Sequence, residues 1–516
     1  MILKHWPLVA LSSLPVSLTA QDWEREKVDF AAIEDRAKQL AAAPYVASDK
    51  ESLPGWMKDL TYDQYRDIRF KEDKALWREE NLPFRAMFFH PGYLFCEPVV
   101  IREATDTHMQ DVRLTEAFYT YGDVVGERGE MPSDAGFAGL KLLTQLNGSE
   151  LFDELIVFQG ASYWRALAKG QLYGISARGV AVDTGADGVP EEFPAFREFW
   201  LKKPTADAET VVLYGLLDGP SLSGAFRFEI RPGDETRVAV RAVLFPRKEI
   251  GRLGIAPMSS MFWFGENSKR RFDDFRPEVH DSDGLAIQMA NGERIWRPLE
   301  NDTGNLGFSF FGADALKGFG LLQRDRRFEA YEDGEAGYEK RPSLWIEPTS
   351  EWGAGSVMLM EIPTGNELAD NSVAMWVPEK TPSAGQRLEF SYIQHWTMES
   401  DPAGAGRYVT ATRTGVHDWQ PEQRTMVVEF AGEGLVGEDG TMPEAFIEAR
   451  SLSGVEVVVQ GTAVQSLPGG RVRLAFQLAP KEEGGKLAES GPLELRAGLK
   501  RGDDFLTETW VYRINP

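Results

Sequence analysis

Two aspartates have the chemistry of a general acid and a general base. Asp281 lies in a polar segment, residues 276–284, and Asp370 lies in a second one, residues 361–371. A pair of carboxyls can break a glycosidic bond, because one protonates the leaving oxygen while the other activates water. The acid must hold its proton near neutral pH, which requires partial burial or a neighbouring negative charge. Aspartate before Asn or Ser is also common in turns, so the residues alone leave a turn role open.

A third polar segment, residues 338–348, mixes aromatic, cationic and acidic residues beside a predicted strand. Aromatic rings can stack on the apolar faces of sugar rings, while carboxylates and Arg form hydrogen bonds with sugar hydroxyls. The chain contains 14 Trp, 14 Tyr and 30 Phe, which is compatible with a sugar ligand. Core packing also accounts for many aromatic side chains, so composition alone keeps both interpretations open.

Several common catalytic motifs are absent from the sequence. It has no P-loop pattern, no zinc-type Cys and His spacing, and no nucleophile elbow in a strand-turn-helix setting. Its six His residues are scattered, and we therefore expect neither a metal ion nor another cofactor. Cys96 is the only cysteine, which excludes an intramolecular disulfide and suits a buried thiol.

The net charge of −24 argues against nucleic acid and anionic membrane surfaces as partners, because both are bound mainly through Lys and Arg. A chain of 516 residues also exceeds the size of one hydrophobic core, so at least two domains are expected. Residues 1–20 combine an early Lys4, an apolar stretch and a Leu-Thr-Ala end, which predicts a secretory signal peptide. Pro7 and Pro15 interrupt the apolar part, which is short for a membrane span.

The polar segments must be positioned by an all-β scaffold. Residues 30–43 show the helical spacing of apolar residues and predict the clearest helix. From about residue 84 onward, short alternating runs separated by Gly, Asp, Asn and Pro predict the strands of a sandwich or barrel. A break near residues 398–407 precedes a second body with enough strands for a small immunoglobulin-like sandwich. We expect an N-terminal domain, a linker and a C-terminal domain over residues 21–403, 404–422 and 423–516.

Long sequence blocks occur at and between these segments. They include GFAGLKLL at residues 136–143, GASYWRALAKGQLYGISARGVAVDTG at 160–185, EEFPAFREFW at 191–200 and LGIAPMSSMFWFGEN at 253–267. They continue with RPEVHDSDGL, KRPSLWIEP and EWGAGSVMLMEIPTGNELADNSVAMW in that order. In these blocks the chain resembles the periplasmic glucan biosynthesis proteins G and D of Gram-negative bacteria, and the resemblance covers nearly the whole chain beyond the predicted signal.

The resemblance implies a large N-terminal β-sandwich like that of galactose mutarotase-type proteins, joined to a small C-terminal immunoglobulin-like β-sandwich. It also implies a periplasmic role in making osmoregulated glucans, whose backbone is β-1,2-linked glucose. Some members resemble inverting enzymes that cleave this backbone, and others resemble transglycosylases that join or cyclise it. The implied partners are a β-1,2-glucan polysaccharide and, as further alternatives, a membrane glucan synthase and a second copy of the chain.

By position, the resemblance assigns the role of general acid to Asp370 and the role of general base to Asp281. It assigns substrate binding to Tyr338, Arg341, Trp345, Glu367, Arg413 and Trp419. Arg413 opens a segment that closes over the cleft in D-type members, and Trp419 is its candidate aromatic. This segment is shorter here than in D-type relatives. The signal peptide resembles the G type, whereas KRPSLW and ATRTG resemble the D type, so both subtypes stay open.

The leading hypothesis is an enzyme that cleaves or transfers β-1,2-glucan. The competing hypothesis is a non-catalytic glucan-binding protein that holds nascent chains at a membrane synthase, and the presence of both aspartates favours the enzyme. A mutarotase-like epimerase is a third alternative, but that chemistry needs a His and Glu pair, which does not stand out in the sequence. We also expect a long, open cleft into which Tyr338, Arg341 and Trp345 point.

Overall fold

Strands dominate the computed structural model, which confirms the predicted all-β class. The structure describes residues 29–49, 53–132, 134–269, 272–302, 304–404, 406–417, 419–451, 456–481, 487 and 491–514. The predicted signal peptide, residues 1–20, lies outside the described residues. Within those described ranges, every helix is too short or too polar to cross a membrane.

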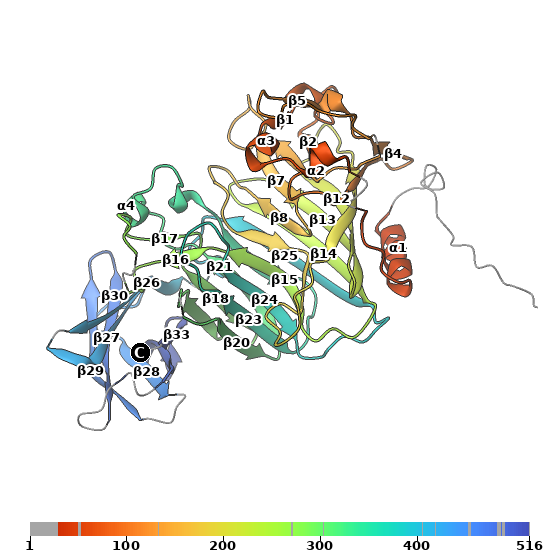
Figure 1. The fold of residues 1–516 in the computed structure, drawn as a ribbon. Helices are drawn as coiled ribbons and strands as arrows, with labels where there is room; N and C mark the ends of the chain where they lie inside the picture. The colour runs from red at the N-terminus through yellow and green to blue at the C-terminus, as the bar shows by residue number, and fades with distance from the viewer. Residues whose placement is uncertain are drawn as a thin grey trace, which may run out of the picture.

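Two large sheets form the main body of the protein (Figure 1). The first contains, in spatial order, β2 (Phe84–Phe89), β6 (Gly139–Thr144), β7 (Asp153–Gln159), β8 (Tyr163–Ala166), β9 (Ser176–Arg178), β15 (Leu253–Ser260), β24 (Ser372–Pro378), β23 (Gly355–Glu361) and β20 (Gly307–Ala313), with β10 (Val180–Val182) paired to β15. Its strands are short and pair antiparallel with their neighbours.

The second sheet runs from the C-terminal body into the main body. It contains, in spatial order, β28 (Glu444–Ser451), β31 (Leu493–Arg501), β33 (Thr509–Ile514), β19 (Arg294–Pro298), β18 (Gly284–Met289), β21 (Leu316–Leu322), β22 (Ser343–Pro348), β25 (Leu388–Thr397), β14 (Thr236–Pro246), β13 (Leu222–Arg231), β12 (Val211–Asp218), β11 (Ala195–Lys202), β3 (Val100–Ala104) and β4 (Met109–Val112), with β32 (Asp504–Phe505) paired to β31.

Successive side chains on a strand point to opposite faces of its sheet. The main core is formed by the side chains on the two faces that the sheets turn toward each other. Aromatic rings from both sheets meet there. The ring centroids of Phe158 in β7 and Phe228 in β13 are 5.1 Å apart, and those of Trp164 and Phe228 are 5.2 Å apart. The indole of Trp164 donates to Gln394 of β25 at 2.8 Å. This core makes the main body a sandwich, as predicted.

The predicted helix over residues 30–43 is confirmed as α1 (Phe30–Ala42). The Asp29 carboxylate caps its start by accepting from the N–H of Ala32 at 3.1 Å. Phe30 and Ile33 are buried in a small apolar cluster with residues of β12, β13 and β14, so the helix covers part of the outer face of the second sheet.

The remaining short elements lie at the ends of the main sandwich. They are α2 (Gly55–Lys58), α3 (Tyr62–Arg66), β1 (Ile68–Phe70), η3 (Glu72–Lys74), η4 (Glu116–Phe118), β5 (Tyr119–Tyr121), β16 (Phe262–Phe264), β17 (Val279–His280), α4 (Phe328–Tyr331) and η5 (Tyr338–Lys340). In Figure 1, α2, α3, β1 and β5 gather near β2 and β7, while β16, β17 and α4 lie toward the C-terminal body.

The C-terminal body is a small sandwich of two sheets. Its second layer contains, in spatial order, β26 (Arg407–His417), β27 (Gln420–Gly432), β30 (Arg471–Pro480) and β29 (Val457–Leu467). The expected linker over 404–422 therefore differs from the structure, since most of it is strand. Val409 and Ala411 turn buried side chains inward, and β26 pairs with β27 over most of its length.

The two bodies are joined by more than a connecting segment. β19 of the main body pairs in parallel with β33, through Ile295 opposite Thr509 and Trp296 opposite Trp510. The guanidinium of Arg324 lies 2.5 Å from the Glu508 carboxylate, and both side chains are almost fully buried. Glu508 also accepts from the backbone N–H of Val409 at 2.7 Å. A shared sheet and a buried ion pair thus connect the bodies.

Candidate active site

The loops that carry Asp281 and Asp370 are held side by side at the end of β15. The backbone N–H of Asp281 donates to the carbonyl of Met261 at 2.8 Å. The backbone N–H of Asn371, the neighbour of Asp370, donates to the carbonyl of Ser260 at 2.9 Å. Because these two carbonyls belong to adjacent residues, two segments that are far apart in the sequence meet at one point.

The Asn371 side chain locks this junction. It accepts from the backbone N–H of Phe262 at 2.7 Å and donates to the Phe262 carbonyl at 2.9 Å. It also donates to the carbonyl of Ile362 at 3.1 Å, at the start of the Asp370 loop. The hydroxyls of Ser260 and Ser282 lie 2.8 Å apart and tie the Asp281 loop to the same strand end.

Asp281 is a buried carboxyl that faces one cation. Its side chain is only 5% exposed, and the guanidinium of Arg341 donates to it at 2.5 Å. Burial raises the pKa of Asp281 to about 6, with the negative charge of Asp370 acting in the same direction and Arg341 opposing it. Asp281 is therefore largely ionised at neutral pH but gains its proton in mild acid.

Asp370 is the more accessible of the two carboxyls. Its side chain is 30% exposed, and it contacts Arg165 at 3.4 Å and the hydroxyl of Ser176 at 3.3 Å. Burial raises the pKa of Asp370, while Arg165, Ser176 and Arg341 act in the opposite direction. The positive charges of Arg165 and Arg341 oppose the rise in the pKa of both aspartates, although each guanidinium contacts only one of them.

The structure brings Tyr338 and Glu367 to the same site. The Tyr338 hydroxyl donates to the Glu367 carboxylate, and Arg276 holds that carboxylate with two contacts of 2.8 and 3.2 Å. The guanidinium of Arg341 lies 4.3 Å from the centroid of the Tyr338 ring. Tyr338 is only 2% exposed and packs in an apolar cluster, so the expectation that it points into an open cleft differs from the structure. Its buried side chain instead orients the acidic loop and Arg341.

Trp345 does not join this site. It lies in β22, where the neighbouring Leu344 and Ile346 face the main core. Trp345 points to the opposite face of the sheet, is 4% exposed, and packs in the apolar cluster of the C-terminal body with Trp296 and Leu322. The expectation that its ring points into a cleft therefore differs from the structure, because the C-terminal body covers that face.

Arg413 and Trp419 lie on the hairpin formed by β26 and β27. Arg413 contacts Glu266 at 2.6 Å and Glu429 at 3.3 Å. Burial and the negative charge of Glu278 raise the pKa of Glu266 to about 8, while Arg413 opposes the shift. Arg413 and Glu266 line a cavity of about 410 Å³ between the bodies. Trp419 is 76% exposed.

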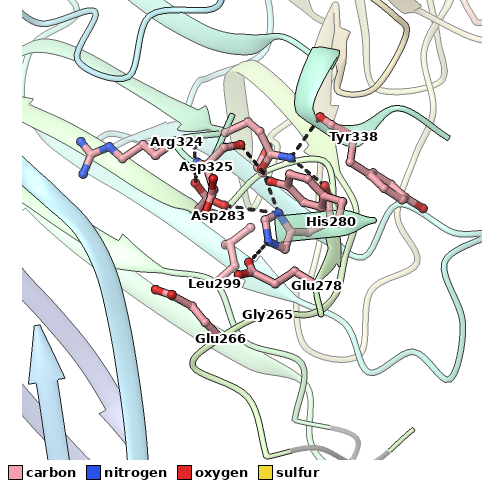
Figure 2. A network of polar contacts seen from close by, with 12 residues as sticks. Gly265, Glu266, Glu278, His280, Asp283, Leu299, Arg324, Asp325 and Tyr338 are labelled. Carbon is pink, nitrogen blue, oxygen red and sulfur yellow. Dashed lines mark hydrogen bonds and ion pairs between the residues drawn. The ribbon is translucent and has the colours of Figure 1, made fainter. Parts of the chain in front are cut away.

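A network of polar contacts surrounds His280, the residue before Asp281 (Figure 2). The two nitrogens of His280 face different carboxylates, with Nε2 2.8 Å from Glu278 and Nδ1 3.3 Å from Asp283. Nδ1 also lies 2.8 Å from the Gln323 side-chain oxygen, and Gln323 donates to the His280 carbonyl at 2.8 Å. His280 directly precedes Asp281, so this network fixes the backbone of the candidate base.

Glu278, His280 and Asp283 have side chains of the types that bind metal ions, and one ligand atom from each lies within 4.8 Å of the others. The geometry favours a protonated imidazole, because both nitrogens of the His280 ring face oxygen acceptors at 2.8 Å, Nε2 toward Glu278 and Nδ1 toward Gln323. Burial lowers the pKa of His280, but Asp283 and Glu278 outweigh it and raise the pKa to about 9. The charged ring thus occupies the place of a cation.

Sequence reasoning missed four residues of the site: Arg165, Ser176, Arg276 and Asn371. Arg165 and Ser176 lie in residues 160–176, GASYWRALAKGQLYGIS, and Arg276 and Asn371 lie in the two polar segments that carry the aspartates. Their location in these segments is the signal by which the sequence could indicate them. Their roles depend on partners distant in the sequence, such as Arg165 with Asp370, and no spacing rule indicates them.

Comparison with known proteins gives one consistent result. Residues 28–514 match the family model described as "Periplasmic glucan biosynthesis protein, MdoG". A "Glucans biosynthesis protein G" from Bradyrhizobium diazoefficiens is 40% identical over 98% of this chain and 97% of its own length. Proteins of the same name from Shewanella sp. and Vibrio cholerae are 44% and 43% identical over 92% of this chain and 85% of theirs. The chain belongs to the periplasmic glucan biosynthesis protein family.

Proposed function

We propose that this protein cleaves or transfers the β-1,2-glucan backbone in the periplasm, with Asp370 as general acid and Asp281 as general base. The observation that carries the proposal is the junction at residues 260–262, where adjacent carbonyls hold both aspartate-bearing loops. The family supports a glucan as the partner. The raised pKa of Asp370 suits a proton donor, and the pKa of Asp281 near 6 suits an acceptor at neutral pH.

In this mechanism, Asp370 gives its proton to the glycosidic oxygen as the bond to the anomeric carbon breaks. A water or a sugar hydroxyl attacks that carbon from the opposite side, so the configuration at the carbon is inverted. The attacking group loses its proton toward Asp281. Direct activation of one water would require carboxyls about 6.5 to 9.5 Å apart. Because Asp281 is almost fully buried, we favour transfer through an intervening water or substrate hydroxyl. The separation and the relay remain predictions.

The supporting residues have defined tasks in this proposal. Arg341 keeps Asp281 oriented and partly ionised, and Arg165 orients Asp370. Tyr338 and Arg276 hold Glu367, which leads into the Asp370 loop. We keep Glu367 as a candidate contact for sugar hydroxyls because its side chain is 31% exposed. Arg413 and Trp419 stay candidates for contacts at the edge of the site.

The test is incubation of the whole protein with linear β-1,2-glucan, followed by sizing of the products. Shorter oligosaccharides indicate hydrolysis, and cyclic or rearranged chains indicate transfer. Asp370→Asn and Asp281→Asn should abolish turnover while retaining glucan binding, because each amide keeps the shape and removes the proton chemistry. Asp314→Asn, an exposed aspartate outside the site, is the matched control.

Near-normal turnover in both site variants would reject the assignment of acid and base. Glucan binding without any product from the wild-type protein would instead support the competing function, a non-catalytic glucan-binding protein that assists a synthase. Association with a membrane synthase and formation of a homodimer are further predictions of the family resemblance. Co-purification from membranes and the mass of the protein in solution test them.

A further inference from the structure

A second cavity lies on the outer face of the first sheet, away from the C-terminal body. It has a volume of about 640 Å³ and lies between α3 and strands β2, β6 and β7. Ligand pockets commonly have volumes of about 300 to 1,000 Å³. Its floor uses residues that alternate with core residues, such as Met87 beside buried Phe88 and Lys141 beside buried Leu140. Phe88 and Tyr119 of the main core also border it, so the cavity lies against the edge of that core.

Aromatic rings form one wall of this cavity. Tyr62 is 59% exposed, and its ring centroid lies 6.2 Å from that of Tyr93. The ring of Tyr65 lies 6.0 Å from Tyr93 and 5.7 Å from Phe95. Tyr93 has φ of 55°, a backbone conformation that side chains other than Gly rarely adopt. The chain thus accepts a strained backbone at a residue that lines the aromatic wall.

Polar groups of both signs complete the cavity. Arg66 lies at the end of α3 and Arg69 in β1, whereas Lys141 lies in β6 and Glu154 in β7. The Gln159 side chain donates to the Tyr65 hydroxyl at 3.0 Å. One exposed and several half-buried rings beside hydrogen-bonding groups of mixed charge suit a neutral ligand rich in hydroxyls, since rings cover its apolar faces and polar groups bind its rim.

Two routes of contact connect this cavity to the candidate active site. Glu154 accepts from Lys141 at 2.5 Å and from the hydroxyl of Tyr173 at 2.9 Å. Gly174, the next residue, packs so closely on Arg341 that an added Cβ would lie 2.9 Å from the Arg341 side chain. Arg341 in turn contacts Asp281.

The second route follows the sheet itself. Val157 of β7 pairs with Arg165 of β8, and Arg165 contacts Asp370. The cavity floor includes Glu154 and Gln159 of the same β7 strand. One sheet face therefore leads from the cavity to the side of the active site on which Asp370 is exposed.

We propose that this aromatic cavity is a remote subsite for the glucan chain, which binds sugar rings several units from the bond that reacts. The inference rests on the proposed function, because it requires a glucan chain that occupies the candidate active site and the aromatic cavity at the same time. A remote subsite makes affinity depend on chain length: long chains contact the active site and the cavity, whereas short oligosaccharides contact the active site alone.

The test measures binding by calorimetry to the full chain carrying Asp370→Asn, so that turnover does not interfere. Two linear β-1,2-glucans are used, one long and one of only a few sugar units. Adding Tyr62→Ala should weaken binding of the long glucan by roughly threefold to tenfold and leave the short one unchanged. Tyr93→Ala should act in the same direction. Phe505→Ala is the matched control, because Phe505 is 61% exposed and lies in the C-terminal body.

Each outcome separates this inference from the proposed function. Long-glucan binding that is unchanged by Tyr62→Ala and Tyr93→Ala overturns the remote subsite alone. Equal weakening of long and short glucans also overturns it, because the cavity would then not be remote. If the protein carrying Asp370→Asn binds neither glucan, the proposed function and the subsite both fail.

Discussion

The buried charge of Asp281 should destabilise the folded protein at neutral pH. Its pKa is raised from 3.8 to about 6, and one pKa unit corresponds to about 1.4 kcal/mol. The folded state holds this proton more tightly than the unfolded state does. The resulting stabilisation is complete below about pH 3.8 and is lost as the pH rises through about 6. At pH 8 the folded protein is therefore less stable by about 3 kcal/mol than it would be without the shift.

Asp281→Asn removes this charge and keeps the shape of the side chain. We expect the variant to raise the free energy of unfolding at pH 8, with about 3 kcal/mol as the upper limit. The gain is reduced because Arg341 loses its ion pair. Arg341 keeps two contacts with the carbonyl of Ala336, at 3.1 and 3.3 Å, so its charge is not left without partners.

The assay is urea denaturation of the wild type and the variant at several values between pH 4 and pH 8. The difference in the free energy of unfolding should shrink as the pH falls through about 6. Asp314→Asn, an exposed aspartate, should show no such trend. A variant that is less stable than the wild type at pH 8, or a gain that is independent of pH, would refute the reasoning.

Four further results are expected. Turnover should fall as the pH drops below about 6, because Asp281 then gains its proton; a pH–rate profile flat from pH 4.5 to 8 would contradict this. Arg324→Ala should lower the free energy of unfolding by about 3 to 5 kcal/mol in urea, since Glu508 is left buried and unpaired. Trp345→Ala should cost about 3 to 5 kcal/mol in the same assay, and a change below 1 kcal/mol would argue against its packing role. Trp419→Ala should change stability by less than about 0.5 kcal/mol, as its ring is 76% exposed.

Periodicity predicts the parts of this fold that depend on local sequence. The apolar spacing in residues 30–43 indicates the helix that α1 forms, because Phe30, Ile33 and Ala37 return to one face. Alternation along β13 and β14 likewise identifies strands with one core face. Such patterns need no knowledge of distant partners.

The sequence does not reveal whether the second face of a strand is covered, or which part of the chain covers it. Leu344, Trp345 and Ile346 form a continuous apolar run, and only the position of the C-terminal body shows that Trp345 packs there. The predicted linker over residues 404–422 differs from the structure for a related reason. Gly404 and Gly406 lie at the predicted break before β26, but whether the residues that follow form a strand depends on their pairing with β27.

The candidate site was found through family resemblance rather than through spacing. Asp281 and Asp370 are ordinary turn aspartates by local rules. Their meeting depends on hydrogen bonds to Ser260 and Met261, which are distant from both in the sequence. Long-range pairing of this kind leaves no local signal, and the same holds for the partnership of Arg276 with Glu367.

The parallel pairing of β19 with β33 also constrains how the chain can fold. Ile295 meets Thr509, so this part of the second sheet closes only after a very long loop has formed. Contacts between such distant residues slow folding, and until β33 docks, β19 presents unpaired backbone groups on that side. A chain shortened before β33 would expose the same groups permanently. Aggregation of such a fragment, rather than release of a stable main body, is the expected consequence.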